Sequence, residues 1–135
     1  MRLFRIVFVS DAVGVAKDGL LPLIDIIGVS DRNNRRDHLT GVLLRHGGRF
    51  LQVVEGARVD LDRMMARVSQ DRRHENMRLL SDRPVEHRLF PDWPMAQLEP
   101  SREVEALMGE ELTEADAGRA ERLLAEMRQS MAVAS

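Results

Sequence analysis

The sequence predicts an α+β fold: a ferredoxin-like βαββαβ(β) sheet with two helices on one face, plus C-terminal helices. Three observations lead to this prediction. The chain opens with an apolar run rich in β-branched residues, a clear hairpin signal follows, and two stretches with the apolar spacing of amphipathic helices connect the strands. This order of elements is that of the split βαβ arrangement.

The first strand is predicted over residues 3–10, "LFRIVFVS", which are rich in Ile, Val and Phe. The run is apolar on both faces except at Arg5, which is typical of a central strand covered on both sides. Phe8 lies near its centre, and the chain contains no tyrosine. Phe8 therefore has two interpretations, a plain core residue or a residue that lacks a functional hydroxyl.

The first helix is predicted over residues 20–30, with Pro22 in its first turn. Its apolar residues recur at i, i+3, i+4 and i+7, which indicates an amphipathic helix. These are Leu20, Leu23, Ile24 and Ile27. We expect the helix to end near Ser30, so that the polar stretch "DRNNRRDH" forms the connection to the next strand.

A β-hairpin is predicted over residues 39–56, "LTGVLLRHGGRFLQVVEG". Gly47-Gly48 separates two apolar runs, and glycine supplies the positive φ that tight hairpin turns need. In the register that this turn implies, Leu43 lies opposite Gln52. Phe50, Gln52 and Val54 would then share one face, which places an amide in the middle of an apolar strand.

A second helix is predicted next, and it ends near Gln70. It is followed by a strand that contains "NMRLL", a break at Pro84, and a loop that leads to Trp93. A short last strand should contain Met95, Ala96 and Leu98. Ser101 and the pair Thr113 and Asp116 can cap two C-terminal helices. The second of these helices has an apolar stripe, which would cover the open face of the sheet or a partner. The residues of the stripe are Ala120, Leu123, Leu124, Met127 and Met131.

Composition excludes several classes of protein. The net charge is −2 with acids and bases interleaved, so we expect no nucleic-acid or membrane partner. The absence of cysteine excludes disulfides and a cysteine-rich zinc site, and the four histidines lack metal-ligand spacing. The chain has no apolar stretch of about 18 residues and no secretory leader, so we expect a cytoplasmic protein.

Four polar features could form a binding site, and each has a plain structural alternative. "RNNRRDH", which contains Asn34, is either a polar connection or a pair of amides that read a heterocycle. The Gln52 amide is hydrogen-bonded either by other groups of the protein or by a ligand. "DRRH", with Asp71, Arg73 and His74, is either a solvated helix end or a site for ribityl and phosphate groups. Trp93 is either a core residue or an aromatic in contact with a cofactor.

Taken together, these stretches resemble the BLUF family of blue-light sensors that use flavin. The matching segments extend from about residue 2 to residue 98, in the same order and with similar gaps. They are "RIVFVS", "NNRRDHLTGVLL", "GGRFLQVVEG", "RVSQDRRHENMRLL" and "RLFPDWPM". The resemblance implies a flavin-binding domain over residues 1–98, with FAD as the cofactor and FMN as the alternative, and a C-terminal helical extension over residues 99–135.

The resemblance also implies roles for single residues. Asn34 would hydrogen-bond the flavin ring, and Gln52 would be the amide that changes its hydrogen bonds after illumination. Four residues would contact the ribityl chain and the phosphates, and these are Arg67, Asp71, Arg73 and His74. Trp93 and Met95 match the pair that exchanges positions in the family's pocket, which would lie between the helices at residues 20–30 and 59–70.

The family pattern departs at Phe8, where relatives carry a tyrosine that hydrogen-bonds the glutamine and gives an electron and a proton to the excited flavin. The resemblance therefore supports flavin binding more than photoswitching. Three hypotheses follow: a flavin protein with a disabled or altered switch, an interaction module that has lost flavin, and a photoreceptor that uses Trp93 as donor. We expect no enzymatic activity, a homo-oligomer, and a signal passed by contact to a separate protein.

Overall fold

The computed structural model describes residues 2–134, and the side chains of residues 2–130. The strands are β1 (Leu3–Ala12), β2 (Thr40–His46), β3 (Arg49–Gly56), β4 (His74–Val85) and β5 (Ala96–Gln97). The helices are α1 (Leu20–Asp37), α2 (Arg58–Ser69), α3 (Arg102–Met108) and α4 (Ala117–Ala134), with short 3-10 turns η1 (Gly14–Lys17) and η2 (Glu114–Asp116).

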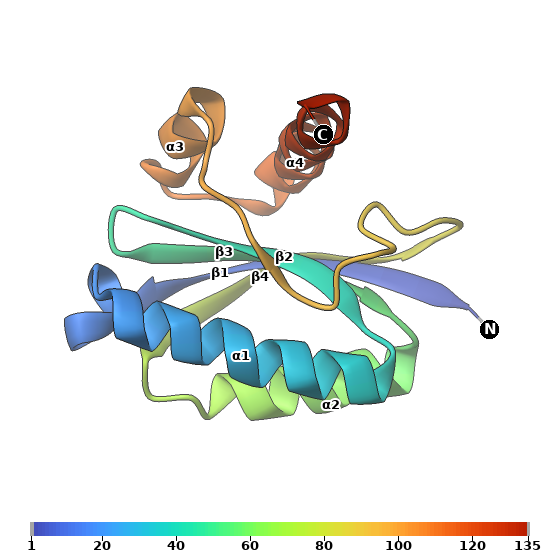
Figure 1. Cartoon of the computed structure of the whole chain (residues 1–135), viewed down its shortest axis with the longest axis horizontal. Helices are drawn as coiled ribbons and strands as arrows, with labels where there is room; N and C mark the ends of the chain where they lie inside the picture. Colours follow the sequence, from blue (N-terminus) through green and yellow to red (C-terminus); the bar gives the residue numbers. More distant parts are fainter. Residues whose placement is uncertain (1, 135) are drawn as a thin grey trace.

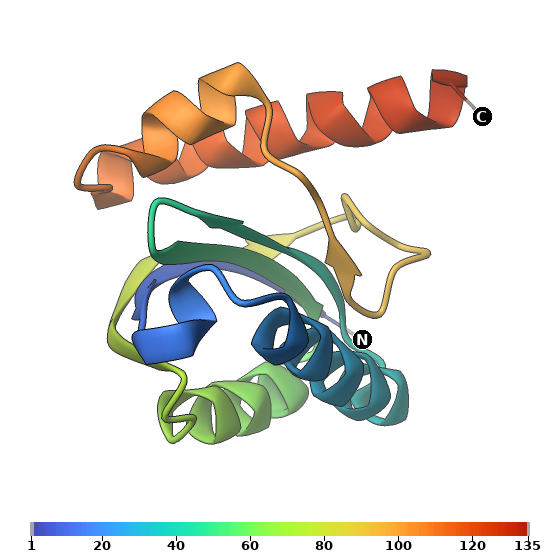
Figure 2. The same ribbon diagram turned by 60° about the vertical axis from the view of Figure 1, so that its left-hand side comes forward.

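The strands form one sheet in the order β4-β1-β3-β2-β5. All neighbouring pairs are antiparallel except β2 and β5, which are parallel. Helices α1 and α2 cover one face of the sheet, and α3 and α4 lie over the other (Figure 1). The predicted ferredoxin-like α+β fold is confirmed, and the second view shows the same two layers of helices (Figure 2).

The sheet separates two apolar cores. On the face of α1 and α2, residues of the strands such as Ile6, Phe8 and Val54 pack with Leu61 of α2. On the opposite face, Val7 and Val53 pack with residues of α3 and α4. The C-terminal helices therefore share a core with the central strands, because successive residues of β1 and β3 point to opposite faces.

The β2–β3 hairpin has the predicted turn and register. Gly47 and Gly48 have φ angles of +59° and +76°, which residues with a Cβ rarely adopt. Leu43 pairs with Gln52 as expected. Phe50 and Val54 belong to the core beside α1 and α2, which confirms the predicted face of β3.

Helix α1 is longer than predicted, since it continues through "DRNNRR" and ends at Asp37. The polar stretch stays helical because Asp31 and Arg35 form an i,i+4 ion pair and because Asn34 and Asp37 are buried. His38 then ends the helix in the left-handed conformation with φ of 56°. The predicted connection is thus the last two turns of α1, which places Asn34 on a helix.

The apolar stripe of α1 is only partly covered. Leu23 is buried, whereas Leu20 and Ile24 are 66% and 56% exposed. The apolar stripe that predicts the helix is therefore only partly buried in the first half of α1.

Strand β4 continues through Pro84 rather than breaking there. A proline is tolerated at this position because β4 is an edge strand, so the missing N–H faces no neighbouring strand.

The C-terminal helices agree with their predicted caps and stripe. Ser101 accepts a hydrogen bond from the backbone N–H of Val104, and Thr113 and Asp116 form a capping box. In α4, Ala120 and Leu124 are buried, while Leu123 and Met127 pack against the same core. The side chain of Met131 lies outside the described residues.

Arg5, a buried charge near the start of β1, belongs to an ion network on the α4 face. Its guanidinium donates to Glu55 of β3 at 2.9 Å and to Glu121 of α4 at 3.1 Å. Glu55 also accepts from the backbone N–H groups of Leu89 and Phe90 at 2.8 and 2.9 Å. A buried arginine is tolerated here because two carboxylates neutralise and hydrogen-bond it.

None of the helices in the described part of the chain combines the length and the apolar character that crossing a bilayer requires.

Candidate functional site

A cleft lies between α1 and α2, with β3 as its floor. Its main compartment is about 160 Å³, and a neighbouring one of about 30 Å³ shares Gln52, Asp71 and Arg73 with it. The wall residues of the main compartment are Val29, Ser30, Asn33, Asn34, Met64, Arg67, Val68 and Met95. The structure thus brings together Asn34, Gln52, Arg67, Asp71, Arg73, Met95 and, in the smaller compartment, His74, as the sequence predicts.

Gln52 is the amide on the floor of the cleft. It is buried on β3, directly opposite Phe8 of β1 and Leu43 of β2. Neither neighbour carries a polar side chain, and among the described residues the Gln52 amide makes no side-chain hydrogen bond. Its amide atoms are not among the buried side-chain atoms that lack a hydrogen-bond partner, so they are open to the cleft that Gln52 lines. The arrangement therefore suits a ligand that hydrogen-bonds Gln52.

Asn34 supplies a second amide at one end of the cleft. Its Nδ2 donates to the carbonyl of Pro94 at 2.6 Å, which joins α1 to the segment before β5. This bond orients the side chain and leaves the amide oxygen as an acceptor toward the cleft. Asn33 lines the cleft beside it, so both amides of "RNNRRDH" reach the site.

Asp71 and Arg73 close the opposite end. Asp71 accepts from the backbone N–H of Arg73 at 2.9 Å and from its guanidinium at 2.6 Å. The hydrogen bond from Arg73 holds the pKa of the Asp71 carboxyl below its usual range. Arg73 also donates to Asp25 of α1, so its side chain spans the opening between the helices.

His74 is held by protein groups at both ring nitrogens. Nε2 lies 2.5 Å from the carbonyl oxygen of Val68, and Nδ1 lies 2.7 Å from Oγ of Ser10. Because a carbonyl can only accept, Nε2 carries a proton. His74 thus fixes the start of β4 against α2 and β1, rather than presenting a free nitrogen to the cleft.

Arg67 ties α2 to the end of α1. One of its terminal nitrogens lies 3.2 Å from Oδ2 of Asp37, a buried carboxylate. The hydrogen bond from Arg36 holds the pKa of Asp37 below its usual range, although burial acts in the opposite direction. Sequence reasoning missed the roles of Asp25 and Asp37. The role of Asp25 depends on how α1 packs beside Arg73, and the role of Asp37 depends on how far α1 extends and on its contact with α2.

Met95 and Trp93 lie on opposite faces of the sheet. Met95 lines the cleft and is buried in the core beside α1 and α2. The Trp93 ring packs with the other core, stacked on Phe90 with centroids 5.9 Å apart, and the Arg128 guanidinium of α4 lies 5.7 Å from the ring. In this arrangement, Met95 rather than Trp93 occupies the site.

Comparisons with known proteins agree with this geometry. The family model "BLUF: Sensors of blue-light using FAD" matches residues 3–96. Photoactivated adenylate cyclase subunit alpha of Euglena gracilis is 32% identical over 94 residues, which are 70% of this chain and 9% of that protein. Subunit beta of the Euglena longa enzyme is 31% identical over 94 residues, 70% of this chain and 11% of that protein. The match therefore spans about a tenth of the length of these curated relatives.

Solved structures share the whole fold. The dark-state structure of BlrB, described as a BLUF protein, is 27% identical with a TM-score of 0.80, covering 93% of this chain and 97% of that one. A bacterial light-regulated adenylyl cyclase is 30% identical with a TM-score of 0.68, covering 97% of this chain and 35% of that one. The C-terminal helices are thus included in both superpositions.

Proposed function

The chain belongs to the BLUF family, the sensors of blue light using FAD, and from this premise we propose that it binds flavin with its light switch disabled or altered at Phe8. The observation that carries the proposal is the buried Gln52 amide, which lies in the cleft with a phenyl ring directly opposite. In this proposal the protein is sensory or regulatory and acts through protein contacts.

The cleft fits a flat heterocycle with a polar edge. Apolar side chains such as Met64, Val68 and Met95 form its walls, and Asn34 and Gln52 offer amides to a carbonyl and N–H edge. Arg67, Asp71 and Arg73 would hold the ribityl chain and phosphate, while His74 shapes the base of the site. We propose FAD as the cofactor, with FMN as the alternative, since both carry the same ring and ribityl phosphate.

Loading the cleft requires Arg73 to move. The cavity of about 160 Å³ is smaller than the roughly 300–1,000 Å³ of small-molecule sites. The ion pair of Arg73 with Asp25 crosses the opening, and Asp25 is 67% exposed. Exposed ion pairs contribute about 0–1 kcal/mol, so a phosphate can replace Asp25 as the partner of Arg73 at little cost.

Loss of the hydroxyl at position 8 is the reason to expect an altered switch. A bound flavin supplies the absorption of blue light. Phe8 fills the space opposite Gln52 but can neither hydrogen-bond the amide nor release a proton, and its ring is hard to oxidise. Trp93, the alternative donor, packs against Phe90 on the far side of the sheet, which disfavours that role.

The route proposed for the signal runs through the sheet. Phe8 belongs to the core beside α1 and α2, whereas its neighbours Val7 and Val9 belong to the core beneath α3 and α4. A change in β1 or β3 at the cleft would therefore reach the C-terminal helices through side chains already in contact. We propose a non-enzymatic output through these helices to a separate protein or to another copy of the chain.

A second candidate is an interaction module that has lost flavin. The observation in its favour is the narrow cleft, which the contact between Arg73 and Asp25 spans. In this alternative the ion pair serves as a permanent tie between α1 and the start of β4, and Gln52 is a relic of the ancestral site.

The flavin content of the purified protein distinguishes the two candidates. We expect protein incubated with FAD and freed of unbound ligand to show the flavin absorption band and to release FAD on heating. Gln52→Leu should weaken binding, whereas Gln129→Leu, an exposed position on α4, should not. A colourless protein that takes up neither FAD nor FMN would refute flavin binding and favour the interaction module.

A further inference from the structure

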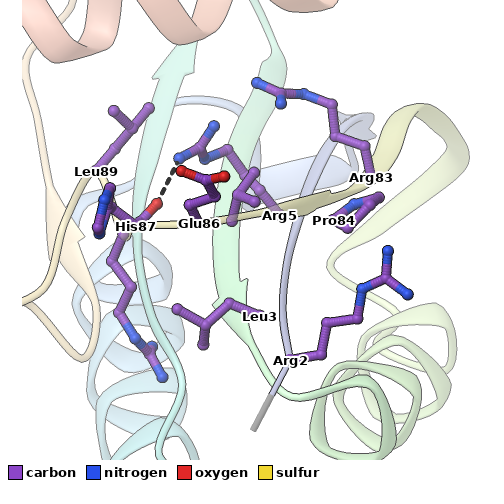
Figure 3. A pocket seen from close by; sticks show the side chains of 10 residues that line it. Arg2, Leu3, Arg5, Arg83, Pro84, Glu86, His87 and Leu89 are labelled. Carbon is purple, nitrogen blue, oxygen red and sulfur yellow. Dashed lines mark hydrogen bonds between the residues drawn. The ribbon is translucent and has the colours of Figure 1, made fainter.

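A second open space, separate from the flavin cleft, lies at the end of the sheet where β1 starts and β4 ends (Figure 3). This groove encloses about 900 Å³ and shares no lining residue with the cleft between α1 and α2. Its charged wall residues are four arginines and one carboxylate, and these are Arg2, Arg5, Arg83, Arg88 and Glu86. The chain as a whole has a net charge of −2, so this concentration of cations is local.

Two of the four arginines each make three hydrogen bonds that hold the fold. Arg5 donates to Glu55, Glu121 and the carbonyl of His87. Arg88 donates to Thr40, to the carbonyl of Glu55 and to the carbonyl of His38 at the end of α1. Arg88 meets no carboxylate in these contacts, so its positive charge remains uncompensated beside the groove.

The other two arginines have donors to spare. Arg83 lies directly opposite Arg5 in the β1–β4 register, and this like-charge pair shares one oxygen of Glu121. Only Nη2 of Arg83 is used in that contact, and the side chain is 51% exposed. Arg2 lies over the ring of Phe4 and forms no ion pair with any described residue. Both guanidinium groups can therefore donate hydrogen bonds to an added anion.

We propose that this groove binds a carboxylate-rich segment of a protein partner. Carboxylates match guanidinium donors in geometry and charge, and two arginines of the wall, Arg2 and Arg88, form no ion pair with a described residue, whereas the wall contains a single carboxylate, Glu86. A peptide fits better than a compact ligand for two reasons. The groove is open along the surface, and it lies at the end of β4, an edge strand with a neighbour on one side only.

Binding there would also affect α4. Arg83 joins β4 to Glu121 of α4, and the second oxygen of Glu121 is buried without a hydrogen-bond partner among the described residues. A carboxylate that draws Arg83 away would leave Glu121 dependent on Arg5 alone. The groove is therefore placed to couple partner binding to the docking of the C-terminal helix.

The test uses a fluorescein-labelled hexaglutamate peptide and fluorescence anisotropy with the full chain. We expect binding that weakens as salt increases, no binding of a hexaglutamine peptide, and about tenfold weaker binding after Arg2→Gln with Arg83→Gln. Arg32→Gln, an exposed arginine on α1, is the matched control and should bind like the wild type. Arg2→Gln alone removes no side-chain hydrogen bond to any described residue, so it reports on the groove even if the double variant unfolds.

Three outcomes would overturn the proposal. Equal binding of hexaglutamine would exclude charge recognition. An equal loss in Arg32→Gln would assign the binding to the general surface charge. Displacement of the peptide by stoichiometric pyrophosphate, with tighter binding of pyrophosphate itself, would make the groove a site for a small phosphate ligand instead.

Discussion

Phe8 and Gln52 face each other directly across the pairing of β1 with β3; Gln52 lines the cleft between α1 and α2, and Phe8 belongs to the core on the same side of the sheet. Phe8 has no exposed surface, so no water reaches the side of Gln52 that the ring covers. The amide is left to find its partner in the cleft. This pair links the two properties that we propose, flavin binding and an altered light response.

Restoring the hydroxyl with Phe8→Tyr should create the missing partner of Gln52. We expect the flavin-loaded variant to show a reversible red shift of its absorption band on illumination, measured by difference spectroscopy, and the wild type to show none. Phe4→Tyr, four residues earlier on the same strand, is the control and should behave like the wild type. A wild-type response equal to that of Phe8→Tyr would disprove the role of Phe8.

Removing the amide with Gln52→Leu should stabilise the flavin-free protein. Leucine has a similar volume and replaces the amide by apolar surface between Phe8 and Leu43, so we expect a gain of about 1 kcal/mol in the free energy of unfolding, measured in urea. Gln129→Leu should change it by less than about 0.5 kcal/mol because the side chain is exposed. A loss of stability in Gln52→Leu would mean that the amide is satisfied within the protein.

Cutting the contact across the cleft with Asp25→Asn should speed flavin uptake. The substitution removes the ion pair between Arg73 and the exposed Asp25, while Arg73 stays paired with Asp71, so we expect a several-fold faster association rate in stopped-flow fluorescence and a change in stability below about 1 kcal/mol. Asp31→Asn breaks an ion pair with Arg35 on the same helix and serves as the control. An unchanged rate would show that the ion pair does not gate the cleft.

The parts of the fold that could be predicted from sequence are those with local causes. The Gly47-Gly48 turn sets the register of the hairpin, and that register alone places Gln52 among apolar neighbours. The capping box of Thr113 and Asp116 lies within four residues. In both cases the interacting groups are close in the chain, so the pattern contains the information.

The parts that could not be predicted depend on packing between distant segments. From sequence, the last turns of α1 are predicted to be a polar connection. The sequence pattern does not contain the contacts with distant segments that these turns make, such as that of Asp37 with Arg67. The exposure of Leu20 and Ile24 depends on which part of α1 meets the sheet. The choice between Trp93 and Met95 depends on Phe90 and on α4, which contact the tryptophan from far away in sequence.

The buried carboxylate of Asp37 should make stability depend on pH at the junction of α1 and α2. Arg36 holds the pKa of Asp37 below its usual value of about 3.9, so the charged form stabilises the fold above that pH and is lost as the pH falls through the lowered value. We expect Asp37→Asn to be about 1–2 kcal/mol less stable than the wild type at about pH 6, with the difference shrinking in urea titrations as the pH falls through the lowered pKa of Asp37. Asp92→Asn, on an exposed side chain beside Arg128, should match the wild type at both pH values. A difference between wild type and Asp37→Asn that stays constant with pH would show that the charge of Asp37 is not what stabilises the junction.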